Sequence, residues 1–235
     1  MNYATADLHG YPLEAFLDLL HRAGFCNGDT LYVLGDVIDR NGDGGVSTLL
    51  WMLDQPNVQL ILGNHEDMLL SCASLFKADR LPARKEMTPA RRALLQEWMA
   101  HGGRPTLKSL FALRQESPER LNALLSALMD LPLYETASAG GRNFVLVHSG
   151  LGNFRPRKPL SVYTSDELLI HRPSRKERYF DDMLTVFGHT PTTKLHGTSG
   201  RMLCMPTWID IDTGAGKGGA PMLLRLEDLE PFYAK

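Results

Sequence analysis

Residues 30–40 read TLYVLGDVIDR, an apolar run that ends in two aspartates and an arginine. The first part, Thr30–Leu34, is short, apolar and followed by glycine, which predicts a buried β-strand. Asp36, Asp39 and Arg40 therefore lie where the strand passes into a loop. Ligands of parallel sheets bind outside the carboxyl ends of the strands, so this junction predicts part of a functional site.

Strand-like and helix-like segments alternate on both sides of this run. Asn2–Ala6 and Val58–Leu62 have the short apolar character of buried strands. Apolar residues at helical spacing predict helices at Leu13–Arg22, Gly45–Leu53 and Glu66–Phe76. This order of strands and helices predicts a mainly parallel sheet with helices packed against it.

The alternation stops at about residues 77–131, where we expect a helical insertion over one side of the site that shapes specificity. Its predicted helices are Thr88–Ala100, Thr106–Leu113 and Pro118–Met129. Strand-like runs then return at Leu133–Thr136, Asn143–Val147, Leu184–Phe187, Leu203–Asp212 and Met222–Leu226. The expected fold is α/β with four layers: a central β-sandwich of two mixed sheets flanked by helices. Since one core is enough for 235 residues, we expect residues 1–235 to form a single domain.

Five apolar runs along the chain end in residues that bind metals, and we name these endings the ligand segments. They are DLHG at 7–10, GDVIDR at 35–40, GNHE at 63–66, HSG at 148–150 and GHT at 188–190. Hard oxygen ligands mixed with imidazoles suit a pair of Mn-, Fe- or Zn-like divalent ions. Such a pair stabilises both the attacking and the leaving oxygen during displacement at phosphorus. The ligand segments therefore predict a two-metal phosphoesterase.

The residue types suggest individual roles. Asp7 and His9 lie two positions apart, so both would face one side of an extended strand, although both are also common turn residues. Asp36 is the expected bridge, because a carboxylate can give one oxygen to each of two ions about 3.5–4 Å apart. Arg40 is the expected phosphate clamp, because a guanidinium contacts two phosphate oxygens at once. His189 follows a strand-like run as a ligand would, but it could also cap the Thr-Pro pair after it.

In their order, the ligand segments resemble the calcineurin-like metallophosphoesterases, most closely the bacterial and phage branch of the phosphoprotein (Ser/Thr) phosphatase family. That family shows GDxHG, GDxxDR, GNHE, a histidine before a glycine pair, and GH; this chain shows ADLHG, GDVIDR, GNHE, HSG and FGHT. Two weaker points of resemblance are Trp98…Gly102-Gly103…Thr106, similar to a W…nGG…T stretch, and ELLIHR at 167–172, similar to ELLWIR. Ala6, Asn41 and Ser149 depart from the pattern, which bears on substrate fit more than on metal binding.

The resemblance implies a role for each residue of the site. The implied metal ligands are Asp7, His9, Asp36, Asn64, His148 and His189. His65 would protonate the leaving group and Asp39 would orient it, although His65 could instead pack behind the ligands. Arg40, Arg172 and Asn64 would bind the substrate phosphate, although Arg172 could also be a solvated arginine of a basic loop.

The implied activity is metal-dependent hydrolysis of phosphomonoesters by a hydroxide bound to a dinuclear metal centre, with phosphoserine and phosphothreonine in proteins as the expected substrates. Hydrolysis of diadenosine tetraphosphate and other dinucleoside polyphosphates is the alternative activity. A non-catalytic scaffold is a third reading, which the full set of ligand positions disfavours. Two Mn²⁺ ions are the expected cofactors, with Fe, Zn, Ni or Mg as alternatives. The expected partner is a phosphorylated protein or a small phosphoester.

Composition excludes several other classes of function. The net charge is −2 and no basic stripe is present, so no nucleic-acid partner is expected. No apolar run approaches the roughly 20 residues of a membrane span, and the first residues lack the layout of a signal peptide. The three cysteines are widely separated, which disfavours a disulfide framework. A cytoplasmic protein without membrane contact is therefore expected.

Overall fold

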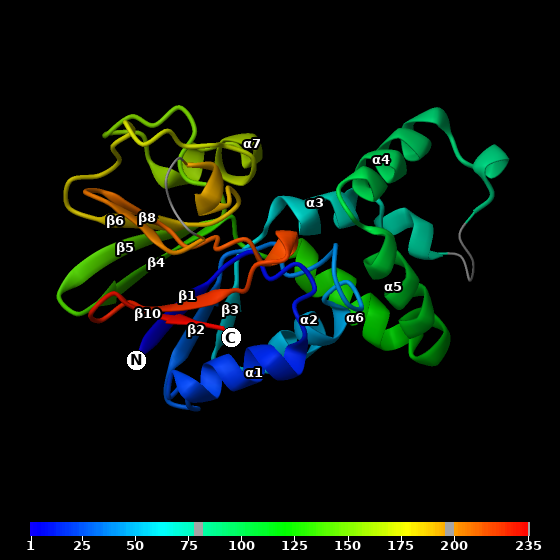
Figure 1. The fold of residues 1–235 in the computed structure, drawn as a ribbon. Coiled ribbons are helices and arrows are strands. Elements are labelled where there is room, and N and C mark those ends of the chain that lie inside the picture. Colours follow the sequence, from blue (N-terminus) through cyan, green and yellow to red (C-terminus); the bar gives the residue numbers. More distant parts are fainter. Residues whose placement is uncertain (78–81, 196–199, 235) are drawn as a thin grey trace.

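The computed structural model describes residues 1–77, 82–195 and 200–234. Within these residues the strands form two five-stranded sheets that face each other (Figure 1). The first sheet has the order β10-β9-β1-β2-β3. Its strands are β1 (Asn2–Thr5), β2 (Thr30–Val33), β3 (Val58–Leu60), β9 (Met222–Arg225) and β10 (Glu230–Tyr233). β1, β2 and β3 are parallel, whereas β9 and β10 add an antiparallel edge.

The second sheet has the order β4-β5-β6-β8-β7. Its strands are β4 (Tyr134–Ala139), β5 (Arg142–Val147), β6 (Leu184–Phe187), β7 (Leu203–Met205) and β8 (Trp208–Asp210). β5, β6 and β8 are parallel, and β4 and β7 pair antiparallel at the two edges. Both sheets are thus mixed, which confirms the expected β-sandwich.

The prediction of the last strands was wrong in two places. The run Leu203–Asp212 is not one strand but the hairpin β7–β8, because a turn at Pro206 and Thr207 reverses the chain. Proline favours such a turn, since it has no N–H to donate to a ladder. β10 was not predicted at all; it follows β9 after a four-residue turn at residues 226–229.

Successive side chains along each strand point to opposite faces of the sheet, which divides the core into layers. Tyr3 faces the helices that cover the first sheet, whereas Ala4 faces the second sheet, as the two-residue period of a strand requires. Ala4 meets Leu146 and Val186 of the second sheet in the space between the sheets. α1 (Leu13–Arg22) and α2 (Val46–Leu53) cover the outer face of the first sheet.

The outer face of the second sheet is covered by α7 (Ser165–Leu169) and the loops around it. Leu168 of α7 and Tyr179 pack with Phe187 and Trp208. α7 was not predicted, although Thr164 and Glu167 form a capping box at its start, which is a helix signal visible in the sequence. The four expected layers are therefore the helices α1 and α2, the first sheet, the second sheet, and the cover formed by α7 and the loops around it.

The predicted insertion lies between α3 (Asn64–Ser71) and β4. It contains α4 (Pro89–Ala100), α5 (Arg104–Glu116) and α6 (Pro118–Met129), and residues 78–81 lie outside the described residues. Figure 1 shows α4 and α5 extending to one side of the sandwich. The predicted helix Glu66–Phe76 instead ends at Ser71, and a 3-10 helix, Ala73–Lys77, follows it. Further 3-10 turns are Arg84–Glu86, Leu160–Val162, Thr192–Lys194 and Ala215–Lys217.

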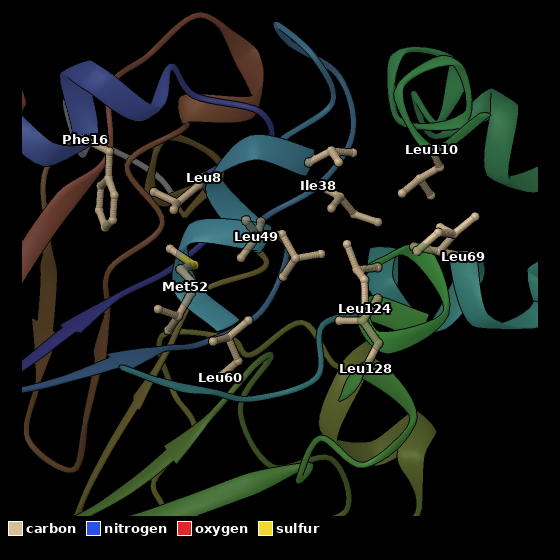
Figure 2. Packing of buried hydrophobic residues seen from close by; sticks show 14 of the residues in the cluster. Leu8, Phe16, Ile38, Leu49, Met52, Leu60, Leu69, Leu110, Leu124 and Leu128 are labelled. Atoms are coloured by element: carbon tan, nitrogen blue, oxygen red, sulfur yellow. The ribbon is translucent and has the colours of Figure 1, made fainter. Parts of the chain in front are cut away.

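The insertion shares one apolar cluster with the helices of the first sheet. Figure 2 shows Leu110 and Leu124 of the insertion on one side of Ile38, and Leu49 and Met52 of α2 on the other. All five side chains are at most 1% exposed, and burying each one contributes roughly 1.5–3 kcal/mol relative to exposure. This cluster ties the insertion to the loop that follows β2. None of the described helices is both long and apolar enough to cross a membrane.

Candidate metal centre

The five ligand segments converge on one site at the ends of strands from both sheets. β1 and β2 lead into the segments of Asp7 and Asp36, and β5 and β6 lead into those of His148 and His189. Asn64 opens α3, directly after β3. The structure therefore brings together all six predicted metal ligands, although they are spread over more than 180 positions of sequence.

Backbone strain marks the same segments. Among the described residues, eight other than glycine have a positive φ, and six of them belong to the ligand segments. These six are Asp7, His9, Asp36, Asp39, Arg40 and His189. The expectation that Asp7 and His9 share a face of an extended strand was wrong, because β1 ends at Thr5. Left-handed backbone beyond the strand turns these side chains toward the site, and such strain concentrates at functional sites.

Asp36 lies between two groups of ligands. Its Oδ2 is 3.5 Å from His9 Nε2, and its Oδ1 is 3.5 Å from His148 Nε2. The first group joins Asp36 to His9 and His65, and the second joins it to His148 and His189; within each group the ligand atoms lie within 4.8 Å of one another. One oxygen of Asp36 therefore faces each group, which is the arrangement expected of a bridging carboxylate.

Asn64 and Asp7 complete the two groups. Asn64 Oδ1 lies 3.0 Å from His148 Nε2 and 2.8 Å from His189 Nδ1. Asp7 Oδ1 lies 3.7 Å from His9 Nε2, while Asp7 Oδ2 accepts a hydrogen bond of 2.7 Å from the backbone N–H of His189. Asp7 thus adds an oxygen to the first group and Asn64 adds one to the second.

The donor set fits divalent ions. Asp7 Oδ1 and His189 Nε2 are buried and, within the described part of the chain, have no hydrogen-bond partner. Burial lowers the pKa of both His9 and His189 to about 3, so both rings are neutral near pH 7, as metal ligands must be. Although burial opposes it, the surrounding histidines lower the pKa of Asp36. Neutral imidazoles around an ionised carboxylate form a site that a cation would complete.

Neighbouring backbone groups fix the orientation of the ligands. His9 Nδ1 lies 3.1 Å from the Ile38 carbonyl, and His148 Nδ1 lies 2.7 Å from the Leu34 carbonyl. Each contact leaves Nε2 facing the site, the kind of support that orients metal-binding histidines. The loop that carries Asp36 is anchored by Glu66, whose role sequence reasoning missed. Its carboxylate accepts the backbone N–H groups of Asp36, Val37 and Ile38 at 2.8, 2.9 and 3.2 Å.

Gly188 allows a close approach between two ligand segments. A Cβ at this position would lie 2.0 Å from Asp7 Oδ2 and 2.6 Å from the Cβ of Ala6. Real Cβ atoms do not approach other heavy atoms this closely. The glycine before His189 is therefore required for Asp7 to occupy its place.

His65 and Asp39 form a buried pair beside the first group. His65 Nδ1 lies 2.6 Å from Asp39 Oδ2, and the two residues are 1% and 0% exposed. Although burial lowers the pKa of His65, the charges of Asp36 and Asp39 raise it above the ordinary value. His65 Nε2 faces Arg40, whose Nη2 donates to it at 3.0 Å. The ring thus directs Nδ1 at Asp39 and Nε2 to the side where the ligands converge.

The two predicted phosphate-binding arginines lie beside different ligand groups. Arg40 is half-buried and lies at the first group, where it contacts His65. Arg172 is exposed and donates a hydrogen bond of 3.3 Å to Thr190 Oγ1, next to His189. Burial is the main reason for the lowered pKa of His148 and His189, and the charge of Arg172 adds to it. Both cations therefore act on the space between the ligand groups.

Comparison with known proteins agrees with this geometry. The model of the calcineurin-like phosphoesterase family matches residues 3–211. The chain belongs to the calcineurin-like phosphoesterase family. Members of this family bind divalent metals in a dinuclear site and hydrolyse phosphoesters. The match confirms the predicted calcineurin-like family.

Two curated relatives of this chain are named symmetrical bis(5'-nucleosyl)-tetraphosphatase. The protein of Delftia acidovorans is 24% identical over 196 residues, which are 80% of this chain and 57% of that protein. The protein of Acidovorax sp. is 27% identical over 170 residues, which are 72% of this chain and 48% of that protein. The chain thus spans about half the length of the curated relatives it matches.

Two solved structures share the fold of this chain. A protein described as a candidate diadenosine tetraphosphatase has a TM-score of 0.64 at 18% identity, covering 99% of this chain and 91% of its own. A serine/threonine phosphatase of Saccharomyces cerevisiae, described as similar to human phosphatase PP5, has a TM-score of 0.57 at 15% identity. That match covers 100% of this chain and 80% of the yeast chain.

Two residues that depart from the family pattern connect loops of this chain through hydrogen bonds. Asn41 Nδ2 donates to the carbonyl of His9 at 3.0 Å and to that of Ala215 at 3.2 Å. Ser149 Oγ accepts the backbone N–H of His171 at 3.1 Å. Asn41 thereby joins a ligand segment to the loop before β9, and Ser149 joins another to the loop of Arg172. Both departures have a structural use and leave the ligand groups intact.

Sequence reasoning also missed two lysines at the edge of the site. Lys194 and Lys217 are exposed and lie side by side, on the loop after His189 and the loop before β9. The pKa of Lys194 is lowered mainly by the adjoining Lys217, and further by burial and by the charges of Arg172 and Arg40. Lys194, Lys217, Arg40 and Arg172 therefore lie close enough for the last three to act on Lys194. Nothing in the spacing of these lysines indicates that they meet.

Proposed function

We propose that this chain hydrolyses phosphoesters with two divalent ions, Mn²⁺ being the expected metal. Asp7, His9 and Asp36 would hold the first ion. Asp36, Asn64, His148 and His189 would hold the second. The observation that carries the proposal is the position of Asp36, which directs one oxygen to each ligand group. When bound, two such ions lower the pKa of water and stabilise charge at phosphorus.

The cations of the chain would bind and orient the phosphate. Arg40 lies at the first ligand group and Arg172 beside the second, and a guanidinium can donate two parallel hydrogen bonds to phosphate oxygens. Asn64 turns its carbonyl oxygen toward His148 and His189, which leaves its amide nitrogen to donate to the substrate. Charge fixed in place before the substrate arrives stabilises the transition state without reorganisation during the reaction.

His65 would supply the proton for the leaving oxygen. Its Nδ1 is occupied by Asp39 at 2.6 Å, so Nε2 is the nitrogen that faces the substrate. In this structure Arg40 donates a hydrogen bond to this nitrogen. A phosphate that binds Arg40 instead would leave the nitrogen available for proton transfer. Asp39 favours the protonated ring and fixes its orientation, as the aspartate of a serine-hydrolase triad does.

Hydrolysis of p-nitrophenyl phosphate in the presence of Mn²⁺ tests the proposal. We expect turnover that stops when EDTA removes the metals and returns when Mn²⁺ is added back. Asp36→Asn should abolish turnover and lower the metal content, whereas His65→Asn should retain the metals and lose rate on phenyl phosphate, whose leaving group needs a proton. Turnover that continues in protein shown by elemental analysis to be free of metal would refute the proposal.

Phosphoserine and phosphothreonine in proteins are the first candidate substrates. The support is the resemblance to the bacterial protein phosphatases, which extends beyond the ligand segments to Trp98, Thr106 and the ELLIHR segment. The open approach to Arg172 suits a phosphate carried on a peptide. A serine or threonine phosphopeptide incubated with Mn²⁺ should release phosphate if this substrate is the right one.

Dinucleoside polyphosphates are a second candidate, favoured by a separate observation. Lys194 and Lys217 place two further positive charges beside Arg40 and Arg172, more than one phosphate group needs. Like charges held together are unfavourable, and a chain of linked phosphates would offset their repulsion. The names of the curated relatives agree with this candidate.

Kinetics on two substrates separate the candidates. If polyphosphate is the substrate, Lys194→Ala and Lys217→Ala should raise KM for diadenosine tetraphosphate several-fold and leave p-nitrophenyl phosphate almost unchanged. Lys176→Ala, which removes an exposed lysine from another loop, is the matched control. Hydrolysis of the phosphopeptide with none of diadenosine tetraphosphate would remove the second candidate.

A further inference from the structure

The helical insertion reaches into the site through the junction between α4 and α5. Trp98, near the end of α4, has its Nε1 2.9 Å from Asp39 Oδ2 and 3.1 Å from Oδ1. Thr106, in the first turn of α5, has its Oγ1 2.6 Å from Asp39 Oδ1. The same hydroxyl accepts the backbone N–H of Asp39 at 3.0 Å. Two side chains of the insertion therefore hold the partner of His65.

These contacts leave the Asp39 carboxylate no freedom to turn. Oδ2 faces His65 and Trp98, and Oδ1 faces Thr106 and Trp98. Donors placed on both oxygens fix the plane of the group, which directs Oδ2 at His65 Nδ1. All four residues are at most 1% exposed, so water cannot replace a lost donor at small cost. The orientation of His65 thus depends on hydrogen bonds from α4 and α5.

The backbone of the junction is shaped for the same contacts. A Cβ on Gly103 would lie 2.4 Å from Trp98 Nε1, so only glycine lets the chain pass behind the indole. The preceding carbonyl, that of Gly102, accepts the backbone N–H of Arg40 at 3.0 Å. Asp39 and Arg40, both in left-handed conformation, are therefore held by one short segment of the insertion, residues 98–106.

We propose that Trp98 and Thr106 are positioning residues for proton transfer: they fix Asp39 so that His65 presents Nε2 to the leaving oxygen. The inference rests on the proposed function, in which His65 donates that proton. Water forms the new bond to phosphorus and its two protons stay with the released phosphate, while the bond to the leaving oxygen breaks with its electron pair on that oxygen. The proton of His65 Nε2 then moves to this oxygen, while Asp39 stays ionised. The insertion, expected to shape specificity, takes part in the chemical step.

Two aryl phosphates can test this role, because their leaving groups differ in whether they need a proton. Phenyl phosphate has a basic leaving group that needs protonation, whereas p-nitrophenyl phosphate has a good one that departs without it. Thr106→Val keeps the shape of the side chain and removes the hydroxyl, and Trp98→Phe removes the indole N–H. We expect each to lower kcat on phenyl phosphate by about tenfold, since general acids contribute roughly 10²–10⁴-fold. The loss on p-nitrophenyl phosphate should stay below about threefold.

Conservative and distant variants provide the controls. Thr106→Ser keeps the hydroxyl and should behave like the wild type on both esters. Trp51→Phe, in α2 and packed against Phe16, should change both rates equally if at all. Metal content and melting temperature of each variant show whether the site remains assembled. If Thr106→Val does not fold, Trp98→Phe, which keeps most of the ring volume, decides the question.

A second measurement asks whether the two residues act through His65. In a His65→Asn background, Thr106→Val should cause no further loss on phenyl phosphate, because the proton donor is already absent. Equal losses on both esters with the metals retained, or a full additional loss in the His65→Asn background, would overturn the inference. A wild-type protein that hydrolyses neither ester in Mn²⁺ would refute the proposed function, and the inference with it. The two failures are therefore distinguishable.

Discussion

Gly188→Ala is a small change that should disable the first metal position. The added Cβ would lie 2.0 Å from Asp7 Oδ2, whereas real Cβ atoms keep at least 3.0 Å from such atoms. Either the Asp7 carboxylate or the end of β6 must therefore move by about 1 Å, in a region packed as densely as a crystal. Gly188 itself cannot retreat freely, because its N–H donates to the carbonyl of His148 at 2.8 Å. We therefore expect the Asp7 carboxylate to be the group that is displaced.

A shift of this size has a predictable cost. Changes to the groups that support metal ligands lower metal affinity or activity by about 10–100-fold, and misplacing a reacting group by about 1 Å can cost about 100-fold in rate. We therefore expect Gly188→Ala to bind one of two Mn²⁺ ions at least tenfold more weakly. Its kcat should fall by about 100-fold at a Mn²⁺ concentration that saturates the wild type. The fold should remain, since the added methyl lies at the site and not in the apolar clusters.

Calorimetric titration with Mn²⁺, elemental analysis and turnover of p-nitrophenyl phosphate would measure these effects. Gly28→Ala is the matched control, because a Cβ there has no heavy atom within 4 Å; it should bind Mn²⁺ normally and change stability by less than about 1 kcal/mol. Ala6→Gly added to Gly188→Ala removes the contact with Ala6 but not the one with Asp7, so it should not restore binding. Wild-type affinity for two ions in Gly188→Ala would refute this account of the site.

Three further outcomes follow from the structure. His148→Ala should lower occupancy of one ion, whereas Asp36→Asn should lower occupancy of both, because Asp36 faces both groups; elemental analysis after dialysis against Mn²⁺ measures the difference. Arg172→Ala should lower kcat/KM for p-nitrophenyl phosphate by about tenfold, near the lower end for hydrogen bonds to a charged group, and Lys176→Ala should leave it unchanged. Leu124→Ala, at a position that is 1% exposed, should lower the free energy of unfolding by about 3 kcal/mol in urea titrations, and a loss below about 1 kcal/mol would contradict the packing in Figure 2.

The first sheet and the ligand groups could be predicted because the apolar runs, the flanking glycines and the helical spacing all indicate the same elements. Thr30–Leu34 is apolar and bounded by glycine, and β2 occupies Thr30–Val33. The helix Leu13–Arg22 matches its predicted bounds, since its apolar spacing leaves a single face to bury. Once strands of this kind lie parallel, the residues after them meet at one edge. The hairpin β7–β8 shows the limit of the method, because a continuous apolar run hides a turn.

The finer parts of the site depend on contacts between distant segments. Glu66 is visible in the sequence next to His65, yet its bonds to the Asp36 loop exist only when the start of α3 lies beside the loop that follows β2. The pair Lys194 and Lys217 likewise forms only in space, since 23 positions separate them. The left-handed backbone of Asp7 could not be predicted either, because the local sequence gives no reason for the extended strand to end before it. The local sequence pattern identifies where a strand ends, but tertiary packing determines the backbone conformation of the residues that follow it.

The strain in the ligand segments explains why such a site needs so much supporting structure. Six residues with positive φ cost on the order of 1 kcal/mol each. Burial, Asp212 and Asp36 raise the pKa of Asp7, so negative charge there is also unfavourable without a cation. The metal-free site would relax unless its surroundings prevented it. β1, β2, β5 and β6 fix one end of each segment, Glu66 ties down the Asp36 loop, and the α4–α5 junction holds Asp39 and Arg40. Because each support acts on a different segment, losing any one of them should displace its own ligand or proton donor first, before the fold itself fails.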